Sequence, residues 1–221
     1  MTSVTGRLAH FGWSRFGGAI LVLAVVTACS PAPASPAANP TGTTVPAATG
    51  ANSAPDASAA AGVLAKALAP LRAASAFGTS VTAGGNTIVS ASGRSVGAAS
   101  TVSVTTGDRT VEYVRIPPKA WARETGGAWV LVAAGTAPAS PVEVLGAPTS
   151  VTGDGTGVGA VLTAVYPAAA LGLTGDPVAV TITIGSVAVR FSYSVTTSGT
   201  TTISTTTLRP GTADPITAPA P

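Results

Sequence analysis

Apolar and polar residues alternate along much of the chain, most clearly over residues 178–193. A two-residue turn at Gly185-Ser186 predicts a β-hairpin there. Its paired positions are Ile184–Val187, Ile182–Val189, Val180–Phe191 and Val178–Tyr193. The opposite face carries Thr181, Thr183, Ala188, Arg190 and Ser192. An apolar face opposite a largely polar one predicts a hairpin that is half-buried.

Glycine-containing turns predict two earlier hairpins in the same way. A turn at Gly84-Gly85 places Val81 opposite Ile88. A turn at Gly107-Asp108 places apolar residues opposite one another, in the pairs Val104–Val111 and Val102–Tyr113. Both predictions assume that two residues form each turn.

Two further hairpins are predicted with less definite pairing. A loop at Ser198-Gly199-Thr200 returns the chain and brings Ile203 opposite Val195. A Gly126-Gly127 turn separates residues 119–124 from residues 129–132, and its register is open. Together these segments predict an antiparallel meander that is interrupted and then resumed.

Three segments have helical or mixed patterns. Leu64, Leu68 and Leu71 form one apolar stripe of a helix that Pro70 is expected to kink or end near its last turn. Residues 141–145 predict a short helical turn. Residues 158–173 read VGAVLTAVYPAAALGL and predict a helix broken at Pro167. This segment would either pack against the sheet as core or line a cavity.

The first residues have the parts of a bacterial signal peptide. Residues 1–15 carry Arg7 and Arg15 and no acidic residue, and an uncharged apolar run follows from Phe16. Val26-Thr27-Ala28-Cys29 resembles a lipobox, in which the Cys thiol is acylated before cleavage. We therefore expect a signal peptide over 1–28 and lipidation of Cys29. A secreted protein with a chance cysteine and a retained N-terminal anchor are the alternatives.

Composition separates a tether and a tail from a domain. Residues 30–59 are rich in Pro, Ala and Ser, carry one charge and show no apolar period. Such a segment has too little to bury to offset its ordering entropy. We expect 29–59 to be a lipidated cysteine with a disordered tether, 60–209 to be the folded domain, and 210–221 to be a disordered Pro-rich tail. An acylated Cys29 would hold that domain on the outer face of the cytoplasmic membrane, in the cell envelope.

Composition also restricts the chemistry of the mature chain. The sequence has one His, His10, which lies in the leader, and one Cys. Catalytic sites that need His, and Cys-based metal sites, are therefore not expected, and neither is a cofactor. From Cys29 onward there are nine Lys and Arg against eight Asp and Glu, without a basic cluster. Nucleic-acid binding is therefore not expected.

Carboxylate pairs offer the remaining route to an enzyme. The candidates are Asp108, Glu112, Glu124, Glu143, Asp154 and Asp176. Asp108, Asp154 and Asp176 stand beside Gly, as turn residues do, and Glu124 has a nearby Arg. The Gly-rich run after Asp154 lacks the Gly-Lys-Ser/Thr ending of a phosphate loop. We therefore expect no enzymatic activity.

Two stretches carry a resemblance to a known family. Leu68–Phe77 looks like a first helix running into a first strand, and Ala120–Val130 combines an aromatic residue with a following Gly-Gly-X-Trp. The chain in this respect resembles the mycobacterial LppX/LprG lipoproteins, whose fold is related to the LolA/LolB carriers. The resemblance implies an α+β fold: a strongly curved antiparallel β-meander, or half-barrel, with helices on its concave side.

In that family the curved sheet encloses a hydrophobic cavity, so the resemblance implies a protein that binds or carries lipid or acylated glycolipid. The expected lining residues are Val102, Val104, Val111, Tyr113, Trp121, Trp129, Leu162, Val165, Tyr166, Leu171, Phe191 and Tyr193. Simple core packing is the alternative for each of them. The alternative function is a non-catalytic adaptor or structural lipoprotein that binds another envelope protein.

Overall fold

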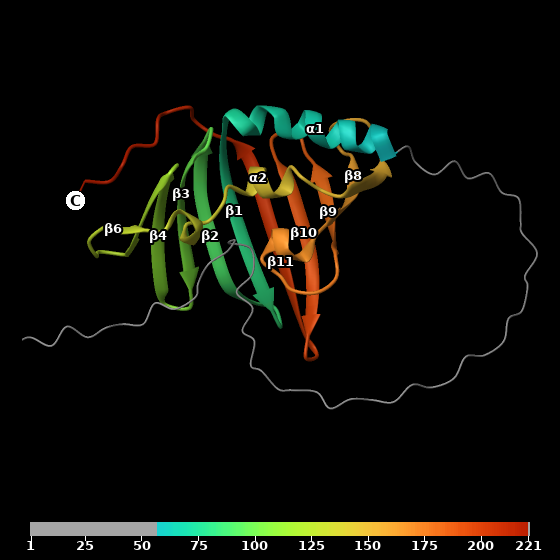
Figure 1. Ribbon diagram of the computed structural model, residues 1–221. Coiled ribbons are helices and arrows are strands. Elements are labelled where there is room, and N and C mark those ends of the chain that lie inside the picture. The colour runs from blue at the N-terminus through green and yellow to red at the C-terminus, as the bar shows by residue number, and fades with distance from the viewer. Residues whose placement is uncertain (1–56, 221) are drawn as a thin grey trace, which may run out of the picture.

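Two β-meanders join to form one antiparallel sheet of eleven strands (Figure 1). The computed structural model describes residues 57–220. The first meander comprises β1 (Ala74–Ala83), β2 (Asn86–Val96), β3 (Ala99–Thr106), β4 (Arg109–Ile116), β5 (Lys119–Glu124) and β6 (Val130–Val132). The second comprises β7 (Ser150–Asp154), β8 (Val161–Tyr166), β9 (Val178–Ile184), β10 (Val189–Thr197) and β11 (Thr200–Pro210).

The two meanders meet where the first strand pairs with the last. β1 and β11 are antiparallel from the Ser75–Pro210 pair to the Ala83–Thr202 pair. The strand order is therefore β6-β5-β4-β3-β2-β1-β11-β10-β9-β8-β7, with β6 and β7 at the two edges. The sheet is curved and does not close, in agreement in outline with the half-barrel that the family resemblance implied.

The helices of the described part are few. They are α1 (Ala57–Ala73), α2 (Pro141–Leu145) and the 3₁₀ turns η1 (Ala134–Thr136) and η2 (Ala168–Leu171). The apolar stripe predicted for α1 is confirmed, because Leu64, Leu68 and Leu71 are all buried. Pro70 does not end the helix, which continues for three residues to Ala73. No helix within residues 57–220 is long and apolar enough to cross a membrane.

α1 lies across the ends of the strands, at the end of the sheet where the β9–β10 turn is found (Figure 1). Its buried leucines join the core cluster with Phe77 of β1 and Phe191 of β10. Leu68 is 1% exposed and Phe191 is 1% exposed. Burying apolar side chains of this size stabilises the fold by about 1.5–3 kcal/mol each. The stripe of leucines thus fixes the helix onto the sheet.

The Gly107-Asp108 hairpin has the expected register, whereas the Gly84-Gly85 hairpin keeps it only beside the turn, so the predicted Val81–Ile88 pair is wrong. The turn at Gly107-Asp108 pairs Val104 with Val111 and Val102 with Tyr113, as predicted. The pairing Thr82–Thr87 follows the register predicted from Gly84-Gly85, but an irregularity after Val81 then places Val81 opposite Val89. The Gly126-Gly127 hairpin is also confirmed, and its open register is resolved by pairs such as Ala122–Val130.

Two other registers were predicted wrongly. Ile184 pairs with Val189 and not with Val187, because four residues form the turn and the Gly185 amide donates to the Ala188 carbonyl at 2.8 Å. A shift of two residues keeps the predicted faces. At the next turn, Val195 pairs with Thr202 and not with Ile203, because two residues and not three form the loop.

The broken helix predicted for residues 158–173 is wrong in its first half. Residues 161–166 form β8, in which Leu162, Ala164 and Tyr166 are buried and Val161 and Thr163 are exposed. The period of two is real, but small apolar residues on both faces obscure it in the sequence. Pro167 ends the strand, and η2 follows.

The limits of the folded part differ slightly from those expected. α1 begins at Ala57, inside the stretch assigned to the tether, and Pro210 belongs to β11. Residues 211–220 have no regular secondary structure, and Arg94 Nη1 donates to the Asp214 carbonyl at 2.7 Å. The predicted signal peptide, Cys29 and nearly all of the tether lie outside the described residues.

Candidate functional site

Most of the predicted lining residues share the core face of the sheet. Val102 pairs with Tyr113 and Val104 with Val111, so these four side chains lie on one side of β3 and β4. The core face also carries Leu162, Tyr166, Phe191 and Tyr193, and Leu171 packs there from η2. The structure therefore brings nine of the twelve residues to one face.

The other three residues lie elsewhere. Trp121 pairs with Val114, next to the Tyr113–Ala122 pair, so it points to the opposite face. Trp129 lies beneath Arg123, whose guanidinium carbon is 4.5 Å from the centre of the ring. Val165 stands between buried Ala164 and Tyr166 on β8 and is turned the other way. Alternation along a strand explains the positions of Trp121 and Val165, whereas Trp129 lies between β5 and β6, outside any strand.

The core face is filled with side chains where the second meander meets α1. Leu162, Tyr166 and Leu171 are each 0% exposed. The Tyr166 hydroxyl donates to the Leu145 carbonyl at 2.6 Å, which ties β8 to α2. Burial raises the pKa of Tyr166 and that of Tyr113, and raises the pKa of Tyr193 to about 12. These tyrosines are thus neutral structural groups at physiological pH.

Two pockets among the described residues lie at the α1 end of the sheet, and none of the twelve predicted residues lines either. The first, which we call the apolar pocket, has a volume of about 370 Å³. It is lined by Val63, Lys66, Ala67, Pro70, Leu71, Thr156, Gly157, Val158, Ile184, Gly185, Ser186, Val187, Ala188, Val189 and Pro210. Lys66 carries the sole charge in this set.

Three elements build the apolar pocket: one flank of α1, the β7–β8 loop and the β9–β10 turn. The loop and the turn are held together by backbone hydrogen bonds. The Gly159 amide donates to the Ile184 carbonyl at 2.7 Å, and the Ile184 amide donates to the Ala160 carbonyl at 2.9 Å. The loop conformation favours glycine at Gly157, where φ is +123°.

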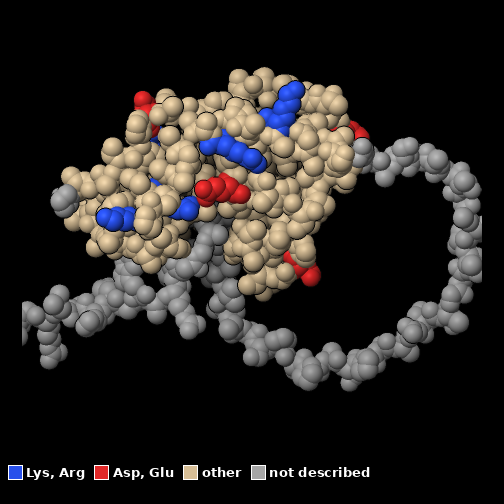
Figure 2. Space-filling model, turned by 45° about the horizontal axis from the view of Figure 1, so that its top comes forward, with Lys and Arg blue, Asp and Glu red and all other residues tan. Residues whose placement is uncertain are grey.

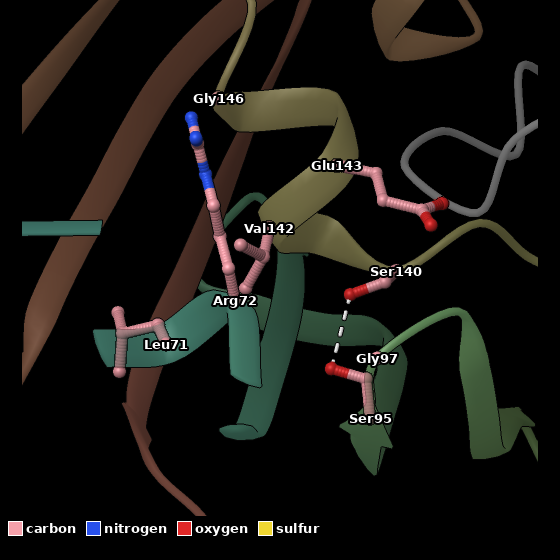
Figure 3. A pocket seen from close by; sticks show the side chains of 8 residues that line it. All are labelled: Leu71, Arg72, Ser95, Gly97, Ser140, Val142, Glu143 and Gly146. Carbon is pink, nitrogen blue, oxygen red and sulfur yellow. Dashed lines mark hydrogen bonds between the residues drawn. The ribbon is translucent and has the colours of Figure 1, made fainter. Parts of the chain in front are cut away.

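The second pocket, which we call the polar pocket, has a volume of about 390 Å³ and lies between the end of α1, α2 and the β2–β3 turn (Figure 3). Ser95 contacts Ser75 at 2.7 Å, and the Ser140 hydroxyl donates to Ser95 at 3.2 Å. Arg72 extends toward Gly146, whereas Glu143 points another way and accepts from Arg115 at 3.2 Å. The serines therefore satisfy one another.

The carboxylates considered for catalysis are spread over the sheet. Glu112 accepts from Arg123, and Glu124 accepts from Arg109. Asp108 lies in the β3–β4 turn, Asp154 ends β7, and Asp176 lies between β8 and β9. No group of three potential metal ligands is found within residues 57–220. Glu112 and Glu124 thus each face an arginine rather than another carboxylate.

The sequence reasoning missed both pockets. Each pocket is formed where α1 packs near turns that are far away in the sequence. No local sequence pattern predicts such packing. The one usable signal was Val187, an apolar residue adjacent to a Gly-Ser turn, which was assigned to a strand. Comparison with protein-family models gives no match, and comparison with curated proteins gives none either.

Proposed function

We propose that this chain is an envelope lipoprotein, anchored through an acylated Cys29, whose folded domain binds the acyl part of a lipid. The resemblance to the LppX/LprG family supports the carrier function. In this proposal the helices cover the concave side of the half-barrel, as in that family. The anchor would place the domain on the outer face of the cytoplasmic membrane, where lipids are available.

The apolar pocket is the observation that carries this proposal. Its walls are predominantly valine, alanine, leucine, isoleucine and proline, and a flexible acyl chain gains about 0.8 kcal/mol for each methylene that it buries. A volume of about 370 Å³ is near the lower end of the range for ligand sites. The pocket therefore suits one acyl chain better than the several chains of a large glycolipid. Lys66 suits an anionic headgroup.

Filling the pocket tests the proposal. Ala67 lines the pocket from α1, whereas Ala65 is exposed on the same helix and does not line it. We expect Ala67→Phe to lower the uptake of a fluorescent fatty acid by the mature chain at least about tenfold, since the ring occupies the acyl site. Ala65→Phe adds the same ring to the same helix and should leave uptake unchanged.

Native mass spectrometry of the mature chain from its host gives a second readout. A discrete lipid released from the chain, and absent from the Ala67→Phe variant, supports the proposal. A bare chain that also takes up no added fatty acid overturns it.

One observation favours the alternative function, an adaptor that binds another envelope protein. The edge strand β6 pairs on one side only, and its Val130 and Leu131 are 57% and 65% exposed. An exposed edge strand can accept a strand from another protein. A crosslinked pull-down of the intact lipoprotein distinguishes the two functions. Recovery of one protein partner, lost in Leu131→Lys, favours the adaptor.

A further inference from the structure

The rim of the apolar pocket carries two unusually exposed apolar side chains. Val158 in the β7–β8 loop is 73% exposed, and Val187 in the β9–β10 turn is 72% exposed, the highest values among the large apolar residues of the described part. Both line the apolar pocket, and backbone hydrogen bonds join their two loops. The two valines therefore project from one structural unit.

The lining of this pocket carries one positive charge, and the nearest acidic residue along the chain, Asp154, ends β7 outside the lining. Lys66 is exposed on α1 and is the one charged residue of the pocket lining, which contains no Asp or Glu. Most of the face seen in Figure 2 is uncharged, and basic and acidic side chains lie next to one another near its centre. Exposed apolar side chains next to a lysine are a combination that suits the interface of a lipid bilayer.

The position of α1 in the chain points to the same surface. Residues 29–56 connect the predicted lipid anchor to Ala57, the first residue of α1. Val63, which lines the pocket, is six residues further on, about 9 Å along the helix. If residues 29–56 form the flexible tether that their composition predicts, they would average roughly 30 Å end to end. The end of the domain that carries the pocket thus stays within reach of the bilayer.

We propose that the rim of the apolar pocket docks on a lipid bilayer, with Val158 and Val187 entering the acyl boundary and Lys66 meeting anionic headgroups. The inference rests on the proposed function, because a docked rim would open the pocket directly to lipid. It specifies the source of the ligand: the membrane that holds the anchor.

Quenching by brominated lipid tests the docking. The mature full chain carrying Val187→Trp, or in a second variant Val158→Trp, is incorporated into vesicles of phosphatidylcholine and phosphatidylglycerol. Brominated acyl chains should quench the introduced indole more strongly than the native tryptophans. Thr197→Trp is the matched control, because Thr197 is exposed at the β10–β11 turn, at the opposite end of the sheet from α1 (Figure 1).

Selective quenching at both rim positions supports the inference, and equal quenching at the rim and at position 197 overturns it. If the rim indole becomes buried without vesicles as the protein concentration rises, a second copy of the chain is the occupant. That result also overturns the inference. In a chain that also carries Val187→Trp, Lys66→Gln should lower the ratio of docked to undocked rim, read from the quenching of the indole, about fivefold when phosphatidylglycerol is present. Fatty-acid uptake is measured separately. A chain that docks but takes up no fatty acid refutes the proposed function and leaves the docking surface standing.

Discussion

Phe77 on β1 and Gly93 on β2 pair directly, and the Phe77 ring occupies the space beside the glycine. A Cβ built on Gly93 would lie 2.7 Å from Phe77 Cζ and 2.1 Å from the Thr101 carbonyl oxygen. The glycine is therefore needed for packing. The absence of a side chain at Gly93 leaves room for the Phe77 ring. On its other side, Phe77 pairs with Leu208 of β11.

Replacing this glycine should destabilise the fold. We expect Gly93→Ala to lower the free energy of unfolding by about 1–3 kcal/mol, since the methyl group must displace the ring and a backbone carbonyl. Urea denaturation of the two chains measures the difference. Gly78→Ala on β1 is the control, because a Cβ there meets nothing within 4 Å. Equal stability of the Gly93→Ala chain and the parent would contradict the packing argument.

A buried pair of hydroxyls holds the two meanders together. Thr79 of β1 and Thr206 of β11 face each other with their Oγ1 atoms 2.9 Å apart, and they are 7% and 1% exposed. Either single Thr→Val change should cost about 1–3 kcal/mol, because it leaves a buried hydroxyl without a partner, whereas the double change should cost less than the sum. A double-mutant cycle by chemical denaturation measures the coupling. Strict additivity would show that the two hydroxyls do not act together.

The sequence predicted the pairing fully at one turn of two residues, whereas at Gly84-Gly85 an irregularity beside Val81 displaced the predicted pair. Gly107-Asp108 set the Val102–Tyr113 pair correctly. The β9–β10 turn was misjudged because Val187 has the character of a strand residue, although it stands 72% exposed in a turn. The shift was two residues, so the core face was still right. At the β10–β11 turn the predicted register was wrong by one residue. Ile203 pairs with Ser194 and not with Val195, and it is 47% exposed.

The candidate site could not be predicted because it depends on long-range packing. Nine of the twelve predicted lining residues lie on one face, although Leu162, Tyr166 and Leu171 were expected in a broken helix, and a shared face does not reveal whether side chains fill it. Here Tyr166 and Phe191 fill it. The apolar pocket is instead made where α1 crosses the strand ends near residues 156–158 and 184–189. The β1–β11 pairing that sets this geometry joins residues more than a hundred positions apart.

The tyrosines predict a loss of stability at alkaline pH. The chain has three tyrosines, and burial raises the pKa of all of them, to about 12 for Tyr193. Above about pH 10 the unfolded chain releases protons that the folded chain keeps, so unfolding becomes more favourable by about 1.4 kcal/mol per pH unit for each tyrosine. This stability is complete below pH 10 and is lost as the pH rises through the folded pKa values.

Denaturation midpoints measured from neutral to strongly alkaline pH, with tyrosinate absorbance followed in parallel, check this expectation. Tyr193→Phe should make the alkaline decline shallower. Normal titration of all three tyrosines in the folded chain would contradict it.

From the proposed acyl anchor on Cys29 we predict where the chain is found in the cell. Cys29 is the single cysteine of the sequence, and without its thiol no acyl group can be attached at the lipobox. We expect Cys29→Ala to move the protein from the membrane fraction to the soluble fraction, because the proposed lipid on the thiol could no longer be attached and hold it. Fractionation with intact-mass measurement checks this, and Ser30→Ala controls for a neighbouring change.

Retention of the Cys29→Ala chain in the membrane would mean that the apolar run after Phe16 itself serves as the anchor. The lipid-carrier proposal would then rest on the apolar pocket alone, and the tether would have to be measured from that run.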